Sequence, residues 1–313
     1  MDFEKVYTST GNKLIFHPEA VMRFKDFHKA TPISLQVALT SRCNLKCSFC
    51  SNVNRKTHES IDADLLQDTI IELLGVGLKT VEWTGGGDPT LYPKINEMIS
   101  FCHKLGLEQG LITNGVQLAE KVSRESLNVL KWVRISMNCL EYVGDIAIPE
   151  IPGTLGFSYV YNEKTTSETI EKIRQYAAIH RAEYVRVVPN CLATDEQQER
   201  NNVELAEFVK TVGYPFFYQA KHFRRPASCY WGLFKPFVLH DGWVYPCSSV
   251  VLNESADRQF HERFRMCRLE KLPQLYLDEA EPVPTTYCNH CVFYPQNAIL
   301  GEMLNRHGME NFI

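Results

Sequence analysis

The sequence lacks an apolar run long enough to span a membrane, and residues 1–5 lack the apolar stretch of a secretory signal. It also lacks internal repeats and low-complexity segments. The 313 residues, 44% of them hydrophobic and 22% charged, suffice for one large domain and a small one. Without a secretory signal, the 11 cysteines are expected to be reduced thiols in the cytoplasm rather than disulfides.

Three of the cysteines lie close together. Cys43, Cys47 and Cys50 follow a C-x3-C-x2-C spacing. Because one face of a regular helix or strand cannot present three such thiolates, the segment is expected to be a loop wrapped around a bound group. Three soft ligands without a fourth suit an iron–sulfur cubane that keeps one iron open. A structural zinc ion would require four ligands.

At these residues the chain resembles the radical S-adenosylmethionine (SAM) superfamily. That signature has this cysteine spacing and commonly an aromatic residue, here Phe49, before the third cysteine. The resemblance implies a [4Fe–4S] cluster whose open iron chelates the amino and carboxylate groups of SAM. It also implies reductive cleavage of SAM to methionine and a 5′-deoxyadenosyl radical, which takes a hydrogen atom from the substrate. The protein would supply position and exclude water.

From residue 34 onward, short β-rich runs alternate with amphipathic helical patterns. Strands are predicted at 34–40, 80–85, 108–113, 132–138, 155–161, 184–189 and 215–219, with helices near 62–75, 93–106, 123–130, 167–181 and 196–211. This alternation predicts a parallel sheet. The resemblance implies a partial (β/α)6 barrel of the TIM type, with its active site at the carboxyl ends of the strands. The short Pro- and Gly-broken link between 138 and 155 predicts a short or missing helix there.

A glycine-rich turn ends the second predicted strand. Gly85, Gly86 and Gly87 precede Asp88, and glycines without a Cβ allow backbone to approach a ligand closely. The resemblance places here the Gly-Gly-Glu motif that contacts the amino group of SAM, with Asp88 in place of the usual Glu. A plain glycine turn is the alternative. Further SAM contacts implied by the resemblance, each of which could instead be simple strand-end capping, are Ser136, Asn138, Pro189 and Asn190.

Four cysteines form a second pattern near the end of the chain. Cys229 is followed by twelve residues, Gly242, four residues and Cys247, and then by Cys288 and Cys291. A hairpin turned at Asp241-Gly242 is predicted between the first two. Four thiolates could close either a cubane or a zinc site.

The pattern resembles the auxiliary-cluster extensions of radical SAM enzymes. The longer extension, SPASM, continues with further cysteines, whereas here Asn297 stands where one would fall. The chain therefore resembles the shortened form, Twitch, which holds one auxiliary [4Fe–4S] cluster. The predicted organisation is an N-terminal extension over 1–33, the barrel over 34–220 and a small α+β auxiliary-cluster domain over 221–313.

The remaining cysteines have weaker assignments. Cys102 lies on the apolar stripe of a predicted helix and is expected in the core. Cys139 and Cys191 follow the fourth and sixth strands, where a thiol could return a hydrogen atom to a substrate radical or simply be packed. Cys267 could replace one ligand of the second cluster. Cys191 and Asp241 are the candidate catalytic residues.

The leading hypothesis is a radical SAM oxidoreductase with two [4Fe–4S] clusters that oxidises a small biosynthetic intermediate. The auxiliary cluster would take the electron, and the first would receive one from a reductant such as flavodoxin or ferredoxin. Residues 1–33 are too few for the usual leader-peptide module, which counts against a peptide substrate. The segment 221–271 has an excess of Lys and Arg and is either a solvated face or a docking surface for an anionic substrate.

Three other hypotheses remain open. A cysteine hydrogen donor would make the enzyme an epimerase or isomerase. The basic segment would suit modification of a nucleotide or nucleic acid. A binding protein with a vestigial cluster would not cleave SAM at all.

Overall fold

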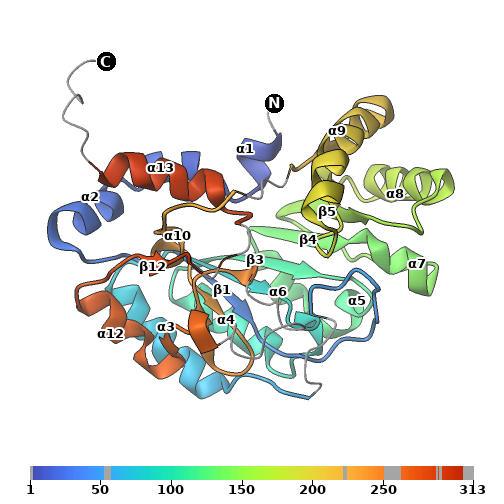
Figure 1. Cartoon of the computed structure of the whole chain (residues 1–313). Helices are drawn as coiled ribbons and strands as arrows, with labels where there is room; N and C mark the ends of the chain where they lie inside the picture. Colours follow the sequence, from blue (N-terminus) through green and yellow to red (C-terminus); the bar gives the residue numbers. More distant parts are fainter. Residues whose placement is uncertain are drawn as a thin grey trace.

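The computed structural model describes residues 3–52, 58–220, 224–249, 262–286, 288 and 291–305, without the side chain of Asp195. Parallel strands alternate with helices along most of it. The strands are β1 (Ser34–Ala38), β2 (Thr80–Thr84), β3 (Glu108–Thr113), β4 (Trp132–Ser136), β5 (Thr154–Tyr161), β6 (Tyr184–Pro189) and β7 (Phe216–Tyr218). Each pairs in parallel with the next, as the alternating pattern predicts. The result is the predicted mixed α/β fold with a partial TIM-type barrel (Figure 1).

Helices cover the outer face of this sheet. They are α3 (Ala63–Gly75), α4 (Ile95–Lys104), α5 (Leu118–Lys121), α6 (Arg124–Val129), α7 (Leu140–Val143), α8 (Ser167–Ile179) and α9 (Asp195–Val212), with short 3-10 turns η2 (Pro89–Leu91) and η3 (Met137–Cys139). Side chains cap several as the sequence indicates: Asp62 accepts from the backbone of Leu65, and Thr194 forms a capping box with Gln197. The link between β4 and β5 carries only the four-residue α7, which confirms the prediction of a short helix.

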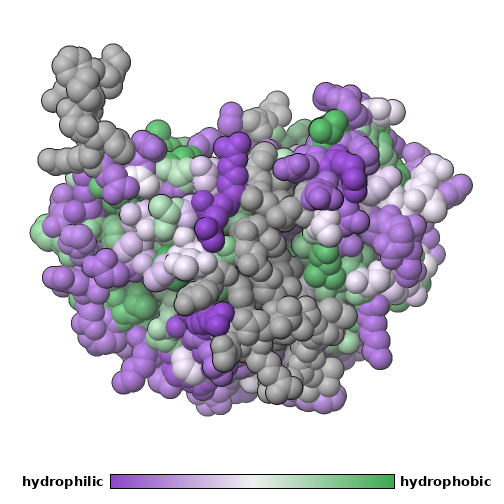
Figure 2. Space-filling view, in the orientation of Figure 1, coloured by the Kyte–Doolittle hydropathy of each residue, from purple (hydrophilic) through white to green (hydrophobic). Residues whose placement is uncertain are grey.

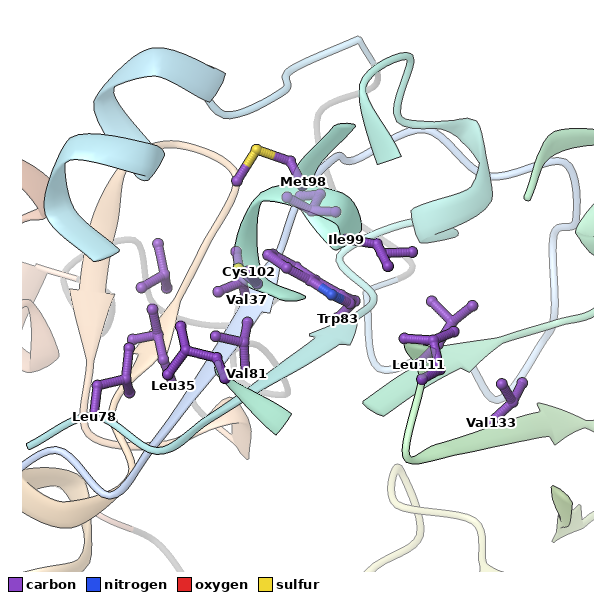
Figure 3. Packing of buried hydrophobic residues seen from close by; sticks show 14 of the residues in the cluster. Leu35, Val37, Leu78, Val81, Trp83, Met98, Ile99, Cys102, Leu111 and Val133 are labelled. Carbon is purple, nitrogen blue, oxygen red and sulfur yellow. The ribbon is translucent and has the colours of Figure 1, made fainter. Parts of the chain in front are cut away.

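The core lies between the sheet and these helices. Alternate residues of β1, β2 and β4 are fully buried, whereas their neighbours Gln36, Glu82 and Arg134 face the barrel interior. Figure 3 shows Trp83 among the buried side chains of neighbouring strands and of α4. Cys102 lies in this cluster, so its assignment to the core is confirmed.

The C-terminal part extends the same sheet beyond β1. β9 (Phe237–Val238) pairs in parallel with β1, and β10 (Trp243–Tyr245) and β11 (Cys267–Arg268) follow antiparallel. β8 (Ser228–Cys229) pairs with β12 (Val283–Pro284) in a separate ribbon. The helical elements here are α10 (Trp231–Phe234), η5 (Leu269–Lys271), α12 (Leu272–Leu277) and α13 (Tyr294–Leu304). The predicted boundary at 220/221 therefore does not interrupt the sheet.

The N-terminal segment forms α1 (Phe3–Tyr7), η1 (Gly11–Phe16) and α2 (Pro18–Phe27). α13 packs beside η1 and α2 (Figure 1), where the Gln296 side chain donates to the Ser9 carbonyl at 2.6 Å. Tyr7 stacks on Tyr184 of β6 with ring centroids 4.4 Å apart. Residues 3–17 thus cover the amino ends of the barrel strands.

The face in Figure 2 is largely hydrophilic over α8 and α9, with apolar surface in small separate areas. None of the helices in the described ranges is both long and apolar enough to cross a membrane.

Candidate active site

The three-cysteine segment is a loop that leaves β1 and lies at the carboxyl ends of the neighbouring strands. Cys43, Cys47 and Cys50 are partly exposed and are not in disulfides. Burial, and then the nearby thiols of Cys50 and Cys43, raise the pKa of Cys47 to about 11. The loop therefore gathers the three predicted ligands where a group could bind from the open end of the barrel.

Contacts from several strand ends hold this loop. The Asn114 side chain, after β3, donates to Asn44 Oδ1 at 2.7 Å and to Cys43 Sγ at 3.7 Å. Tyr142 of α7 accepts from the Ser48 amide at 3.3 Å, and Glu163, after β5, accepts from the Ser48 hydroxyl at 3.0 Å. Tyr142 lies within the broken link between β4 and β5, and Glu163 follows the end of β5. No motif in the sequence singles them out.

The glycine turn after β2 is pressed against the start of the loop. The Gly87 amide donates to the Thr40 carbonyl and the Asp88 amide to the Arg42 carbonyl, both at 2.7 Å. A Cβ on Gly87 would lie 1.9 Å from the Arg42 carbonyl oxygen. A Cβ on Gly86 would lie 2.5 Å from a ring carbon of His240. The glycines therefore make room first for the protein's own chain, rather than for a ligand as the sequence suggested.

Asp88 is buried, and both of its carboxylate oxygens are used within the protein. Oδ1 accepts from the Thr90 hydroxyl at 2.6 Å and the Thr113 hydroxyl at 2.9 Å, and Oδ2 accepts from the Asn114 amide at 2.6 Å. Asp88 thereby ties the end of β2 to the end of β3. The expected contact of Asp88 with SAM stays a prediction, beside this structural role.

Asn138 is likewise occupied. Its Oδ1 accepts from the Val160 amide at 2.7 Å, and its Nδ2 donates to the Val160 carbonyl and to Glu141 at 2.9 Å each. With 1% exposure, it clamps the end of β4 to β5 and is a poor candidate for the expected SAM contact. Ser136 is paired with Ser158 across β4 and β5 and stays available on the barrel's inner face.

The sixth strand ends at Pro189, as the sequence predicts. The Asn190 side chain accepts from the Leu192 amide at 3.0 Å, which is local strand-end capping. Cys191 Sγ lies 3.9 Å from the carbonyl oxygen of Phe49, whose own side chain is buried. Cys191 therefore borders the cysteine loop, as expected of a residue on the active-site side, and Cys139 is buried nearby with a pKa raised to about 12 by burial.

The second set of cysteines also converges. Burial raises the pKa of Cys247 well above its usual range, and the thiols of Cys229, Cys291 and Cys288 raise it further. Cys229 lies in β8 of the β8–β12 ribbon, and Cys291 precedes α13. The structure thus brings together four residues that are widely separated in the sequence.

Asn297 connects the two sides of this second site. Its Oδ1 accepts from the amides of Tyr230 and Trp231 at 2.8 and 2.9 Å, and its Nδ2 lies 3.9 Å from Cys291 Sγ. The position where a further cysteine would fall therefore holds a buried amide that orders the ligand-bearing segments. Cys267 lies apart: it pairs with Val244 and packs toward Tyr276, so it is not the replacement ligand considered above.

The hairpin predicted at Asp241-Gly242 is confirmed. β9 and β10 pair across it, and Gly242 has a φ of +77°, which favours glycine. The Asp241 carboxylate accepts from the Trp243 amide at 3.0 Å within the turn, which is a turn-forming role, and its catalytic role stays a prediction.

His240, which sequence reasoning missed, precedes this turn. Its side chain is 4% exposed, and Nδ1 lies 3.3 Å from Glu59 Oε2. Because its ring also abuts Gly86, His240 couples the C-terminal hairpin to the glycine turn.

The predicted basic segment is only partly described, since 221–223 and 250–261 lie outside the described residues. Within the rest, the guanidinium groups of Arg265 and Arg268 lie 4.5 and 5.0 Å from the ring centre of Trp243. These arginines pack on the hairpin rather than forming a row of free charges.

Comparison with known families bears on the class of this site. Residues 37–142, from β1 through most of α7, match the model of the Radical SAM superfamily. This part of the chain is therefore similar to radical SAM domains. It contains the cysteine loop and the glycine turn.

Solved structures with the same fold extend beyond the radical SAM domain. Streptococcus suis SuiB bound to precursor peptide SuiA matches with a TM-score of 0.58 at 14% identity, over 86% of this chain and 70% of that one. The anSMEcpe enzyme with bound AdoMet and a Kp18Cys peptide matches with a TM-score of 0.51 at 13% identity, over 90% and 86%. At these identities the likeness concerns the fold alone.

Curated relatives align over shorter stretches. PqqA peptide cyclase from Methylorubrum extorquens is 39% identical over 88 residues, which are 27% of this chain and 22% of that protein. GTP 3′,8-cyclase from Clostridium perfringens is 34% identical over 113 residues, which are 34% of this chain and 35% of that protein. The chain thus spans only about a fifth to a third of the length of these relatives.

Proposed function

We propose that this protein is a radical SAM oxidoreductase that cleaves SAM and oxidises a small biosynthetic intermediate. The observation that carries the proposal is the loop of Cys43, Cys47 and Cys50, held across the carboxyl ends of the barrel strands. A [4Fe–4S] cluster held there would supply the electron that cleaves SAM. The thiol set fits such a cluster, because three soft ligands leave one iron open.

The surrounding residues have separate tasks in this proposal. The backbone of the glycine turn, fixed by Asp88 and pressed against the loop, lines the place for the methionine end of SAM. Ser136, on the inner face of β4, is the remaining side-chain candidate for a polar contact. The buried Phe49 side chain beneath the loop helps to exclude water from the cluster. SAM would then lie between the loop and the barrel interior.

The second site fits a closed cluster. Four thiolates can complete the coordination of a cubane, with one thiolate on each iron. The convergence of Cys229, Cys247, Cys288 and Cys291 in a chain that also carries the three-cysteine loop supports an auxiliary [4Fe–4S] cluster as electron acceptor.

Anaerobic reconstitution with iron and sulfide tests the proposal. We expect about eight irons per chain, from two cubanes. Replacing Cys43, Cys47 and Cys50 by Ala should remove half the iron and all formation of 5′-deoxyadenosine from SAM and dithionite. Cys267→Ala is the matched control and should keep both. SAM cleavage by the triple variant would refute the assignment.

A peptide substrate is the second candidate. PqqA peptide cyclases, by name, act on a peptide, and their similarity to this chain favours this class. Incubating the reconstituted enzyme with separate pools of small metabolites and of peptides, then following 5′-deoxyadenosine by chromatography, would separate the two. Stimulation by peptides alone would replace the small-molecule proposal.

Radical epimerisation is supported by one contact, the approach of Cys191 to the loop at Phe49. Its signature in deuterated water would be a product that has the same number of hydrogen atoms as the substrate, one of them replaced by deuterium from the solvent. Cys191→Ala would abolish that product while SAM cleavage continued.

A further inference from the structure

The inside of the barrel carries charge at mid-height. On β4 and β6, the neighbours Val133, Ile135, Val185 and Val187 are fully buried on the outer face, so Arg134 and Arg186 project into the interior. Glu82 of β2 also projects inward. Because β4 and β6 flank β5, the two guanidinium groups share one side of the barrel, and Arg134 is close enough to lower the pKa of Arg186.

The nearby carboxylate is already used. Lys235 Nζ lies 2.6 Å from Glu82 Oε1, and both side chains are largely buried. Lys13, whose pKa is lowered mainly by burial, adds a further cation beside this pair. Glu82 is therefore ion-paired with Lys235, and its charge only partly offsets the lowering of the Arg186 pKa.

Among the described residues, neither arginine forms an ion pair. Arg186 donates to Gln219 Oε1 at 2.9 Å, and the Arg134 guanidinium lies 5.4 Å from the ring centre of Trp132. The Nε of each is buried without a hydrogen-bond partner. Burial, and then the charge of Arg134, lower the pKa of Arg186 to about 9.

Arg186, whose pKa is lowered mainly by burial, is a cation without a carboxylate ion pair, which is costly because desolvation is repaid only by pairing. Space for a counter-charge exists beside its neighbour Arg134, which is partly exposed. Arg134, Lys13 and Glu82 border a cavity of about 270 Å³ that Tyr7 and Tyr184 also line, whereas Arg186 is not among its lining residues. An adjoining cavity of about 290 Å³ is bordered by Lys13, Glu82 and Lys235. More Lys and Arg side chains than carboxylates border these two cavities.

We propose that Arg134 and Arg186 bind an anionic group of the substrate, a phosphate or a carboxylate, inside the barrel. Guanidinium forks match both groups with paired hydrogen bonds. Residues 3–17 cover the amino end of the barrel. A substrate whose anionic group is bound halfway along the strands would therefore extend toward the cysteine loop. The inference rests on the proposed function, since it names the substrate class of that site.

Thermal unfolding of the reconstituted full-length protein tests this inference. Inorganic phosphate, compared with chloride at equal ionic strength and pH 7, should raise the Tm of the wild type by about 2 °C or more. Arg134→Gln and Arg186→Gln should each abolish the rise. Arg124→Gln, which removes only an exposed pair with Glu150, should keep it. Absence of a rise in the wild type with both phosphate and malonate, or an undiminished rise in the variants, would overturn the proposal.

Further arms identify the anion. Malonate in place of phosphate separates carboxylate from phosphate recognition, and the stronger response names the group. The phosphate response should persist when the wild type is saturated with SAM. Its loss would mean that the carboxylate of SAM occupies the arginine pair, which would overturn a substrate role. These unfolding measurements need no reductant, so they can be interpreted even if the protein does not cleave SAM. Likewise, the absence of an anion effect would not contradict SAM cleavage.

Discussion

The contact between Gly86 and His240 gives the sharpest test of how the glycine turn is built. In Gly86→Ala, the new Cβ would lie 2.5 Å from His240 Cδ2 and 3.3 Å from the Thr40 carbonyl oxygen. Carbon atoms prefer about 3.5–4.0 Å, so the ring would have to move by roughly 1 Å. Glu59 and the surrounding burial restrain that movement. Overpacking of this kind costs about 1–3 kcal/mol, and we expect roughly 2 kcal/mol of lost stability.

A double-mutant cycle isolates this contact. His240→Ala removes the ring, so Gly86→Ala should cost at least about 1 kcal/mol less in that background, as measured by urea unfolding under anaerobic conditions. Gly87→Ala is the matched control, because its Cβ would meet the Arg42 backbone at 1.9 Å, which His240→Ala cannot relieve. If the stability losses of Gly86→Ala and His240→Ala add within about 0.5 kcal/mol, the His240 ring does not restrict position 86. In the double variant Gly86→Ala/His240→Ala, where the clash is relieved, SAM affinity can then be measured without a folding defect.

Three further outcomes are expected. The double variant Cys288→Ala/Cys291→Ala should lose half of its iron and form no oxidised product, while it still forms 5′-deoxyadenosine slowly. Turnover at the wild-type rate in this variant, or a stoichiometric zinc in the isolated wild-type protein, would contradict the auxiliary-cluster role. Asn297→Ala should lower stability by about 1–3 kcal/mol in chemical denaturation, because two backbone amides lose their buried acceptor. An unchanged midpoint would show that water replaces the amide. Asp88→Asn should cost a similar amount, because an amide nitrogen cannot accept from Thr113 or Asn114; weakened SAM binding at unchanged stability would instead restore a direct contact.

The barrel could be predicted closely because its signals are local. Strands β3 and β6 have the predicted bounds, and the caps at Asp62, Ser123 and Thr194 mark helix starts through hydrogen bonds within a single turn. The parallel order follows from alternation, since parallel neighbours need a crossover. The cysteine loop was also predictable, because its spacing is itself the constraint.

Contacts between distant segments could not be predicted in the same way. The sequence offers Asp88 and Asn138 as polar residues at strand ends, a position that suits ligand binding and strand clamping equally. Only the tertiary structure shows that Thr113, Asn114 and Val160 already occupy the hydrogen-bonding atoms of these two side chains. The same holds for His240, which becomes significant only because β9 lies beside β1 and carries it to Gly86.

From the sequence alone, the spacing of three cysteines predicts a cluster with an open iron, and the alternating pattern predicts the fold that positions them. The tertiary structure decided which polar side chains remain free for a ligand, because hydrogen-bonding capacity is consumed by neighbours that periodicity cannot reveal. It also brought Arg134 and Arg186 to one side of the barrel interior, where burial and the charge of Arg134 lower the pKa of Arg186. In the sequence they are two arginines in two β-runs; their proximity exists only once β4, β5 and β6 pair in register.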